Sequence, residues 1–403
     1  MRTPAPRHGL LILGLGWLVA CGGSGVGSPC TPTASYAPGV AYGPAVALVT
    51  PSALSVTWTS TNAVVGAIEF GTTAGYGTVL TEPSARTTHE LRVTGLSPSQ
   101  PVHYRLRHDG APTGGDHATR AAVADRSAAP FRFAVVGDTG TGCPEEIGVL
   151  ARVDAMSPDF VLHTGDVAYF QGSAADVRNG FLIPFADLSS RMPVFLTWGN
   201  HDVLTAGGAP LADAVVLPVN DEEGTEIYYS FDWGNLHAIC LDSNRPYGVG
   251  THQRLWLERD LASAAAASAT WLVVAFHHPA YSSSNHGGDP TVDAELVPVF
   301  DAHGVDVVFN GHDHDYERSH PLVAGTPTST TNGPTYLDPV GTLYVVTGGG
   351  GQDLYAAGTS AFTAISESVR HAVRVDVAGA VLTATVIRAD GTTLETFSIT
   401  KSP

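Results

Sequence analysis

The 403-residue chain has little positive charge for its size. Its 20 lysine and arginine residues stand against 38 aspartate and glutamate residues, which gives a formal net charge of −18. This balance argues against nucleic acid as a scaffold partner, because binding to phosphate backbones needs clustered basic side chains. Charged residues make up only 14% of the chain and hydrophobic residues 43%, which argues against disorder and for a sizeable core.

Cysteine is also scarce. The four cysteines form no Cys-x-x-Cys pair, so we do not expect a zinc–thiolate site. Beyond Cys21 the chain has Cys30, Cys143 and Cys240, an odd number that allows one disulfide and one free thiol and leaves the pairing open. Histidine, by contrast, occurs 17 times, nearly as often as lysine and arginine together, and it is the commonest metal ligand in proteins.

The N-terminus is typical of an exported protein. Arg2 and Arg7 precede a short apolar run from Leu10 to Ala20, which has the layout of a secretory signal peptide. The junction before Cys21 resembles a bacterial lipobox, so residues 1–21 predict a signal peptide with lipidation of Cys21. Ordinary signal cleavage, in which Cys21 has no role, is the alternative.

The residues that follow the lipobox are rich in glycine, serine and proline. We expect residues 22–38 to form a flexible tether. No other stretch approaches the roughly 18 apolar residues of a membrane span. The mature chain is therefore expected in the bacterial cell envelope or outside the cell, attached to a membrane only through the lipid. The sequence does not indicate an oligomeric state.

Two domains with different patterns follow. In residues 39–122, short alternating runs such as Ala53–Thr59 and Val102–Arg107 are separated by Gly, Pro and Ser, as in a small β-sandwich. The pattern resembles a fibronectin type III-like domain. No ligand-type side chains cluster in it, so we expect a structural or spacer role, with carbohydrate binding or adhesion as the alternative.

Residues 130–403 alternate strands with helices. Pro144 is expected to open a helix, and a second helix is predicted over His252–Ala269. The alternation predicts an α/β domain whose ligands bind at strand ends. The short apolar runs expected to form its first strands are Phe131–Val136, Phe160–His163, Val194–Thr197, Leu236–Leu241, Leu272–Phe276 and Val305–Phe309.

Five polar clusters each follow one of these strands directly. They read GDTG from Gly137, GDVAY from Gly165, GNHD from Gly199, HHP from His277 and GHDH from Gly311. Strands that lie side by side would bring these oxygen and nitrogen donors to one edge of a sheet, where they cannot all be desolvated without cations. Such mixed ligands suit Fe, Zn or Mn, and two metals that share a carboxylate suit phosphoester hydrolysis.

The combined set GD…GDxxY…GNHD…HxP…GHxHxYER resembles the purple acid phosphatases of the calcineurin-like metallophosphoesterase superfamily, over about residues 131–400. The resemblance implies a four-layer α/β (α+β) sandwich. It also implies a metal-dependent acid phosphatase that hydrolyses small phosphate monoesters through attack by a metal-activated hydroxide. The implied cofactors are Fe(III) and a second, divalent metal, which would be Zn, Fe or Mn.

The resemblance also implies a ligand set. The iron ligands would be Asp138, Asp166, Tyr169 and His314. Asp166 would bridge to the second metal, which Asn200, His277 and His312 would complete. Most members of the superfamily have a histidine ligand two residues after the first aspartate. Here that position is Gly140, and Tyr169 would supply the missing ligand as a phenolate, which favours trivalent iron.

Two histidines that are not ligands are implied to act on the substrate. His201 would orient the phosphate and help protonate the leaving alcohol, and Asp202 is expected either to hold its tautomer or to cap a turn. His286 matches a second substrate-contacting position. Many relatives have a further histidine after it, where this chain has Gly287. His278 is expected at the rim of the site.

Other motifs suggest supporting roles. Glu317 and Arg318 are expected to form a local ion pair, Gly348–Gly351 a turn facing the site, and Asp242 a structural cap. The remaining histidines are interpreted as surface or structural residues. Three other functions stay open, namely phosphodiester or nucleotide hydrolysis, an alkaline Mn- or Zn-only phosphodiesterase, and a surface binding protein with a silent site.

Overall fold

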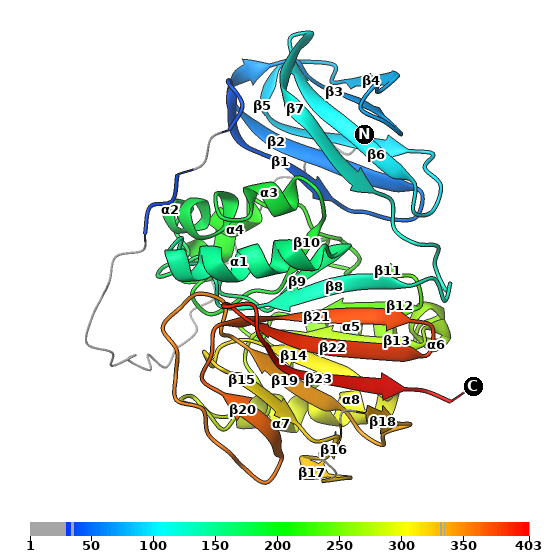
Figure 1. The fold of residues 1–403 in the computed structure, drawn as a ribbon, viewed down its shortest axis with the longest axis vertical. Coiled ribbons are helices and arrows are strands. Elements are labelled where there is room, and N and C mark those ends of the chain that lie inside the picture. Colours follow the sequence, from blue (N-terminus) through cyan, green and yellow to red (C-terminus); the bar gives the residue numbers. More distant parts are fainter. Residues whose placement is uncertain (1–29, 34–35, 331–332, 334, 403) are drawn as a thin grey trace.

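The computed structural model describes residues 30–402 except residues 34–35, 331–332 and 334 (Figure 1). The predicted signal peptide, Cys21 and the first part of the predicted tether lie outside the described residues. The described part of that segment is held at two points, because Cys30 forms a disulfide with Cys143 and the Tyr36 hydroxyl donates to the Leu182 carbonyl at 2.8 Å. The expectation of a free tether up to residue 38 is therefore wrong for its described part. Cys240 is a buried free thiol.

The N-terminal region is a β-sandwich of two antiparallel sheets. Its apolar side chains, such as Ile68 and Tyr104, are buried between the sheets, as the alternating pattern predicts. The Tyr104 hydroxyl donates to the Ser190 carbonyl of the next domain at 2.6 Å. One sheet contains β1 (Val40–Ala47), β2 (Ala53–Val64) and β5 (Arg86–Thr94), and the other contains β4 (Thr78–Thr81), β3 (Gly66–Gly71), β6 (Pro101–His108) and β7 (Ala111–Arg120).

The second domain is built on two seven-stranded sheets that face each other (Figure 1). The first sheet has, in spatial order, β10 (Val194–Leu196), β9 (Phe160–His163), β8 (Phe131–Val136), β21 (His371–Ala378), β22 (Val381–Arg388), β23 (Thr393–Thr400) and β18 (Thr335–Leu337). The second has β11 (Tyr229–Trp233), β12 (Leu236–Cys240), β13 (Trp271–Ala275), β14 (Val307–Asn310), β19 (Leu343–Thr347), β15 (Tyr316–Ser319) and β20 (Thr363–Glu367). A small hairpin of β16 (Leu322–Val323) and β17 (Thr326–Pro327) lies beside them.

Helices cover the outer faces of both sheets. On the first sheet, α1 (Pro144–Met156) buries Val149 and Val153, while α5 (His252–Leu261), α7 (Pro290–Glu295) and α8 (Val297–His303) cover the second. The predicted four-layer sandwich is therefore confirmed. The short helical segments are α2 (Ala174–Val177), η1 (Arg178–Leu182), α3 (Ala186–Ser189), η2 (Ala206–Gly208), α4 (Ala209–Ala212) and α6 (Ala264–Ser268).

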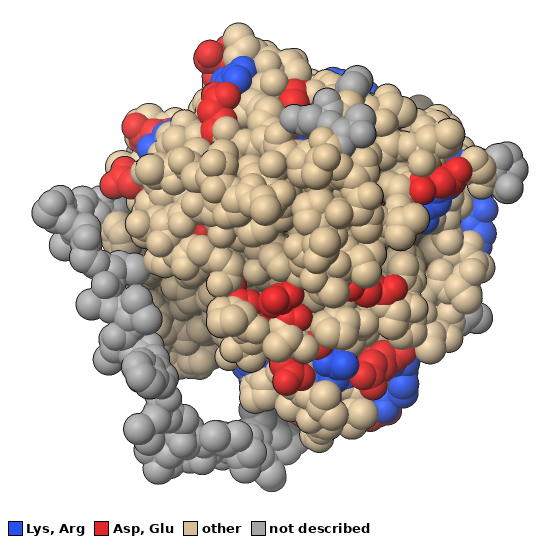
Figure 2. Space-filling view, turned by 90° about the horizontal axis from the view of Figure 1, so that it is seen from below, with Lys and Arg blue, Asp and Glu red and all other residues tan. Residues whose placement is uncertain are grey.

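The single helix predicted over His252–Ala269 is wrong. The chain leaves the helical conformation at Ser263, whose hydroxyl accepts a hydrogen bond from the Ala266 N–H and so starts α6. Among the described residues, no helix has both the length and the apolar character needed to cross a membrane. On the face seen in Figure 2, lysine and arginine side chains are sparse and lie mostly beside acidic ones.

Candidate metal centre

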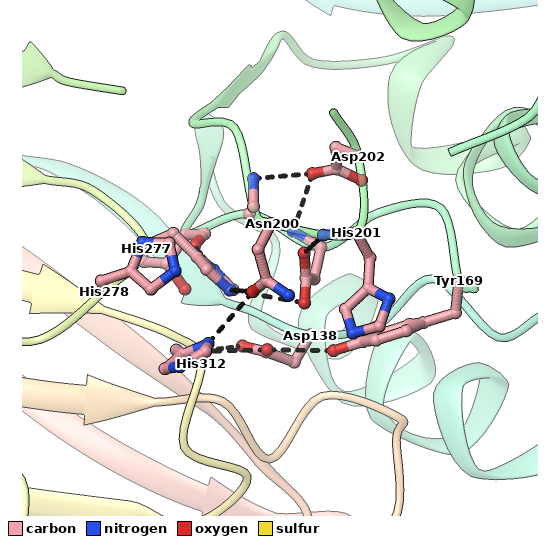
Figure 3. A network of polar contacts seen from close by, with 12 residues as sticks. Asp138, Tyr169, Asn200, His201, Asp202, His277, His278 and His312 are labelled. Atoms are coloured by element: carbon pink, nitrogen blue, oxygen red, sulfur yellow. Dashed lines mark hydrogen bonds and ion pairs between the residues drawn. The ribbon is translucent and has the colours of Figure 1, made fainter. Parts of the chain in front are cut away.

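The polar clusters come together because they follow parallel strands. In the first sheet β8 pairs in parallel with β9, and in the second β13 pairs in parallel with β14. Parallel strands end at the same edge of a sheet, so Asp138 and Asp166 leave one sheet beside each other while His277 and His312 leave the other. Figure 3 shows the side chains of Asp138, His277 and His312 lying close together.

The backbone at these strand ends adopts an unusual conformation. The φ angles of Asp138, Asp166 and His312 are 56°, 57° and 71°, in the left-handed region that residues other than glycine rarely occupy. Such conformations cost free energy and concentrate at functional sites. All three residues were predicted as metal ligands, so the strained positions coincide with the predicted chemistry.

Three of the predicted ligands form the tightest group. The ligand atoms of Asp138, Asp166 and His277 all lie within 4.8 Å of one another, and all three residues are buried. Asp166 Oδ2 lies 3.4 Å from Nε2 of His277. Two carboxylates so close together in a dry environment repel each other unless positive charge lies between them.

Backbone carbonyls fix the tautomers of two histidines. His277 Nδ1 donates to the Thr164 carbonyl at 2.9 Å, and His314 Nδ1 donates to the Asp353 carbonyl at 2.7 Å. A carbonyl oxygen only accepts, so Nδ1 carries the proton in each ring, and Nε2 of the neutral ring presents a lone pair to the site. This arrangement is typical of histidines that bind metals.

The donor set fits a cation. Nε2 of His277 faces Oδ1 of Asn200 at 3.0 Å, so two acceptors point at each other when the ring is neutral. Burial lowers the pKa of His277, but the carboxylates of Asp166 and Asp138 outweigh it and raise the pKa to about 10. The site therefore favours positive charge at this position, which a bound metal ion would supply.

Tyr169 and His312 complete the group around Asp138 (Figure 3). The Tyr169 hydroxyl donates to Asp138 Oδ1 at 3.1 Å and lies 3.2 Å from His314 Nε2. Burial and the carboxylates of Asp138 and Asp166 raise the pKa of Tyr169 well above 10, so its phenolate needs a cation. His312 Nδ1 lies 3.1 Å from Asn200 Oδ1. All seven predicted ligands thus meet in one site, and their role as ligands stays a prediction.

Comparison with known proteins agrees with this geometry. Residues 131–316 match the family model for the Calcineurin-like phosphoesterase domain. The chain contains a calcineurin-like phosphoesterase domain. The resemblance to the calcineurin-like metallophosphoesterases drawn from the sequence is therefore confirmed.

Curated relatives include purple acid phosphatases. Purple acid phosphatase 15 of Arabidopsis thaliana is 29% identical over 294 residues, which are 65% of this chain and 53% of the relative. The uncharacterized protein Rv2577 of Mycobacterium tuberculosis is 30% identical over 356 residues, 73% of this chain and 66% of the relative. The chain thus spans between half and two thirds of these relatives.

Solved structures show the same fold. The purple acid phosphatase PPD1 from yellow lupin (Lupinus luteus) superposes with a TM-score of 0.79 at 21% identity, over 89% of this chain and 74% of that chain. PhoD superposes with a TM-score of 0.61 at 14% identity, over 87% and 91% of the two chains.

His201 lies beside the predicted metal ligands. Its Nδ1 donates to the Phe170 carbonyl at 2.8 Å, and its ring centroid lies 4.5 Å from that of Tyr169. Asp202 does not touch this ring. Its carboxylate accepts the backbone N–H groups of Asp166, Val167 and Gly199 at 2.8–2.9 Å. Of the two expectations for Asp202, the turn cap is correct, and a carbonyl holds the His201 tautomer.

His286 lies at the exposed mouth of the site. Its ring packs against that of His312 with a centroid distance of 4.3 Å and an interplanar angle of 31°, and its backbone N–H donates to Asp313 Oδ1 at 2.8 Å. Tyr355 is a site residue that sequence reasoning missed. Its ring stacks on His314 at 4.2 Å, and its hydroxyl lies 3.4 Å from His286 Nε2. In the sequence, only the glycine-rich turn Gly348–Gly351 just before Tyr355 indicated that this segment lies near the site.

The ion pair expected between Glu317 and Arg318 is wrong. Neighbouring residues on a strand point to opposite faces, so the two side chains diverge. Arg318 forms a buried bidentate pair with Glu395, at 2.9 and 2.8 Å, and Glu317 accepts from the Ser283 N–H at 2.6 Å. The glycine turn does face the site, since a Cβ on Gly348 would lie 2.9 Å from Asp138 Oδ2.

Proposed function

We propose that this protein is a binuclear-metal phosphatase that releases phosphate from small phosphate monoesters at acidic to neutral pH. The observation that carries the proposal is the position of the buried Asp166 beside both Asp138 and the inward-facing Nε2 of His277. A carboxylate with ligand-type groups on both sides is suited to bridging two metal ions. Relatives named as purple acid phosphatases support the same conclusion.

The residues present fit two metal ions of different character. Tyr169, His314, Asp138 and Asp166 would hold Fe(III), because a phenolate and two carboxylates are hard anionic donors. Asn200, His277 and His312, together with Asp166, would hold divalent Zn, Fe or Mn. Bound there, the ions would act as Lewis acids toward phosphoryl oxygens and would lower the pKa of water.

His201 is placed to handle the proton of the leaving alcohol. Because its Nδ1–H is committed to the Phe170 carbonyl, proton exchange takes place at Nε2. Among the described residues Nε2 has no hydrogen-bond partner, and the side chain is partly exposed. A protonated Nε2 would donate to the ester oxygen as it leaves. His286, held by Asp313, is the second candidate donor.

We further propose that the protein is exported and that Cys21 carries a lipid. The disulfide between Cys30 and Cys143 supports export, because such bonds persist in oxidising compartments. Membrane fractions of expressing cells should contain the wild type, and Cys21→Ser should release it as soluble protein. If the Cys21→Ser protein stays in the membrane fraction, the proposed lipidation of Cys21 is refuted.

The catalytic proposal is tested with purified protein and a substrate panel. Phenyl phosphate and sugar phosphates represent monoesters, and bis-phenyl phosphate represents diesters. We expect the monoesters to have the higher kcat/KM, and removal of the metals to abolish both activities. Faster turnover of the diester would favour a phosphodiesterase. A metal-loaded protein that hydrolyses neither class would favour a binding protein with a silent site.

A further inference from the structure

His278 is the second histidine of the His-His pair after β13, and no role is assigned to it. Its surroundings fix the ring in place. The His278 N–H donates to Ser243 Oγ at 3.1 Å, and its Nδ1 lies 2.7 Å from the same oxygen. Among the described residues, Nδ1 of His278 is the only acceptor found for the Ser243 hydroxyl proton.

This contact fixes the tautomer of His278. Since no other acceptor for the Ser243 hydroxyl proton is found among the described residues, we take the hydroxyl to donate to Nδ1, which places the proton of the neutral ring on Nε2. Nε2 has no hydrogen-bond partner among the described residues, and the side chain is only partly buried. His278 therefore presents one unused N–H donor.

The donor lies at the mouth of the site. The ring centroid of His278 is 4.5 Å from that of His312, which in turn is 4.3 Å from that of His286. The three side chains are all partly or fully exposed, whereas Asp138 and Asp166 are buried. His312 contacts the buried carboxylate of Asp138 through its backbone N–H, and the ring of His278 packs against the ring of His312.

The position of the ring indicates which part of a substrate it reaches. A phosphoryl group held at the predicted ligands would lie inside the row of rings, and the alcohol part would extend past it. We propose that Nε2–H of His278 binds the alcohol part of the substrate and selects phosphate monoesters whose alcohol carries hydrogen-bond acceptors. The proposal rests on the proposed phosphatase function.

The test compares two substrates that differ in the alcohol part. Glycerol 2-phosphate carries hydroxyl acceptors and phenyl phosphate carries none. We expect His278→Ala to raise KM for glycerol 2-phosphate about tenfold, the size of one lost hydrogen bond, and to leave KM for phenyl phosphate within about twofold. His278→Gln, which keeps a donor near the Nε2 position, should recover most of the loss.

Ser243 provides a second, independent variant. Ser243→Ala removes the group that sets the tautomer and should show the same selective loss in weaker form, whereas Ser243→Thr keeps the hydroxyl and should behave as wild type. His252→Ala is the matched control, because His252 is an exposed helix residue that pairs with Glu223. Metal content is measured for every variant and should not change.

Several results would overturn the inference. An equal loss for both substrates, or a loss of metal in His278→Ala, would mean that His278 only supports His312. If the wild type hydrolyses neither substrate, the proposed function fails, and calorimetric binding of glycerol 2-phosphate then decides about His278. If His278→Ala binds glycerol 2-phosphate as tightly as wild type, the contact between His278 and the substrate is refuted. A roughly tenfold weaker affinity of the variant supports the contact.

Discussion

Asp166 Oδ2 lies 3.4 Å from Nε2 of His277, and both side chains are buried. The proton of His277 is committed on the other side of the ring, to the Thr164 carbonyl. When the ring is neutral, a carboxylate and a lone pair therefore face each other, with further acceptors of Asp138 and Asn200 close by. This relationship is the structural basis for placing cations at this edge of the two sheets.

Replacement of Asp166 by alanine should remove the activity. The carboxylate is the group shared by both halves of the proposed centre, so we expect kcat/KM for aryl phosphate to fall at least about 100-fold and metal content to decrease. Asp154→Ala is the control, since Asp154 is an exposed partner of Arg191 and such pairs contribute little. Full turnover by Asp166→Ala would contradict the two-metal mechanism.

Tyr169→Phe should remove the colour of the iron-loaded protein. The buried phenol has a pKa well above 10 without a cation, because of burial and the nearby carboxylates, so an absorption band from a phenolate on Fe(III) reports directly on this ligand. Visible spectra of wild type and variant provide the measurement. Tyr36→Phe, which loses a hydrogen bond to the Leu182 carbonyl and leaves every predicted ligand in place, should keep the band. An unchanged spectrum in Tyr169→Phe would refute the assignment.

Gly199→Ala should disturb the site through sterics alone. A Cβ at this position would lie 1.9 Å from Asp166 Oδ1 and 2.3 Å from its backbone nitrogen, so Asp166 must move. We expect a stability loss of about 1–3 kcal/mol together with at least tenfold lower activity. Gly148→Ala in α1 meets no atom within 4 Å and should instead stabilise the protein by about 0.5–1 kcal/mol. Denaturation curves measure the stability of each variant, and steady-state kinetics measure its activity. If Gly199→Ala and Gly148→Ala have the same stability and activity, the packing argument is contradicted.

The pH dependence of stability should include a contribution from His237. Burial lowers its pKa, but hydrogen bonds and charges from Asp232 and Asp260 outweigh this and raise the pKa from 6.5 to about 9. Arg126, bound to Asp232, and Asp125 are further charged groups at this cluster. Since the folded pKa is the higher one, the stabilisation is fully present below pH 6.5 and is lost as pH rises through about 9.

His237→Gln should therefore be less stable than wild type at pH 6, and the difference should shrink toward pH 9. Chemical denaturation at several pH values measures it. His103→Gln serves as the control, because the His103 pair with Asp116 is substantially exposed and should contribute little. A constant difference between wild type and His237→Gln across this pH range would contradict the assignment of a raised pKa.

Reduction should destabilise the protein through the disulfide between Cys30 and Cys143. The two residues are separated by 113 positions, and loops of this length correspond to about 4–5 kcal/mol in the chain-entropy account. We expect a lower thermal midpoint in the presence of dithiothreitol. The variant with both cysteines replaced by serine should be insensitive to the reductant. If dithiothreitol lowers the midpoint of that variant equally, the disulfide is not the cause.

The sequence predicted the convergence of the metal-ligand group because each polar cluster follows its strand directly. Asp138, Asp166, His277 and His312 are positioned by the ends of parallel strands, and that geometry follows from local pattern and sheet topology. The four-layer fold follows from the alternation of strands and helices and from the resemblance that the motif set carries.

Other features depend on contacts that no local pattern contains. Arg318 finds its partner in Glu395, 77 positions away, rather than in its neighbour. A backbone carbonyl, that of Phe170, holds the tautomer of His201, and carbonyls carry no sequence signal. Tyr355 reaches His314 only because the chain turns back after the glycine-rich segment. Such partners are set by tertiary structure and become visible only in three dimensions.

Metal analysis of the purified protein, paired with hydrolysis of phenyl phosphate, tests the central claim most directly. The account predicts about two metal ions per chain, one of them iron, loss of activity when a chelator removes them, and recovery on their return. Sustained turnover by metal-free wild-type protein would contradict it.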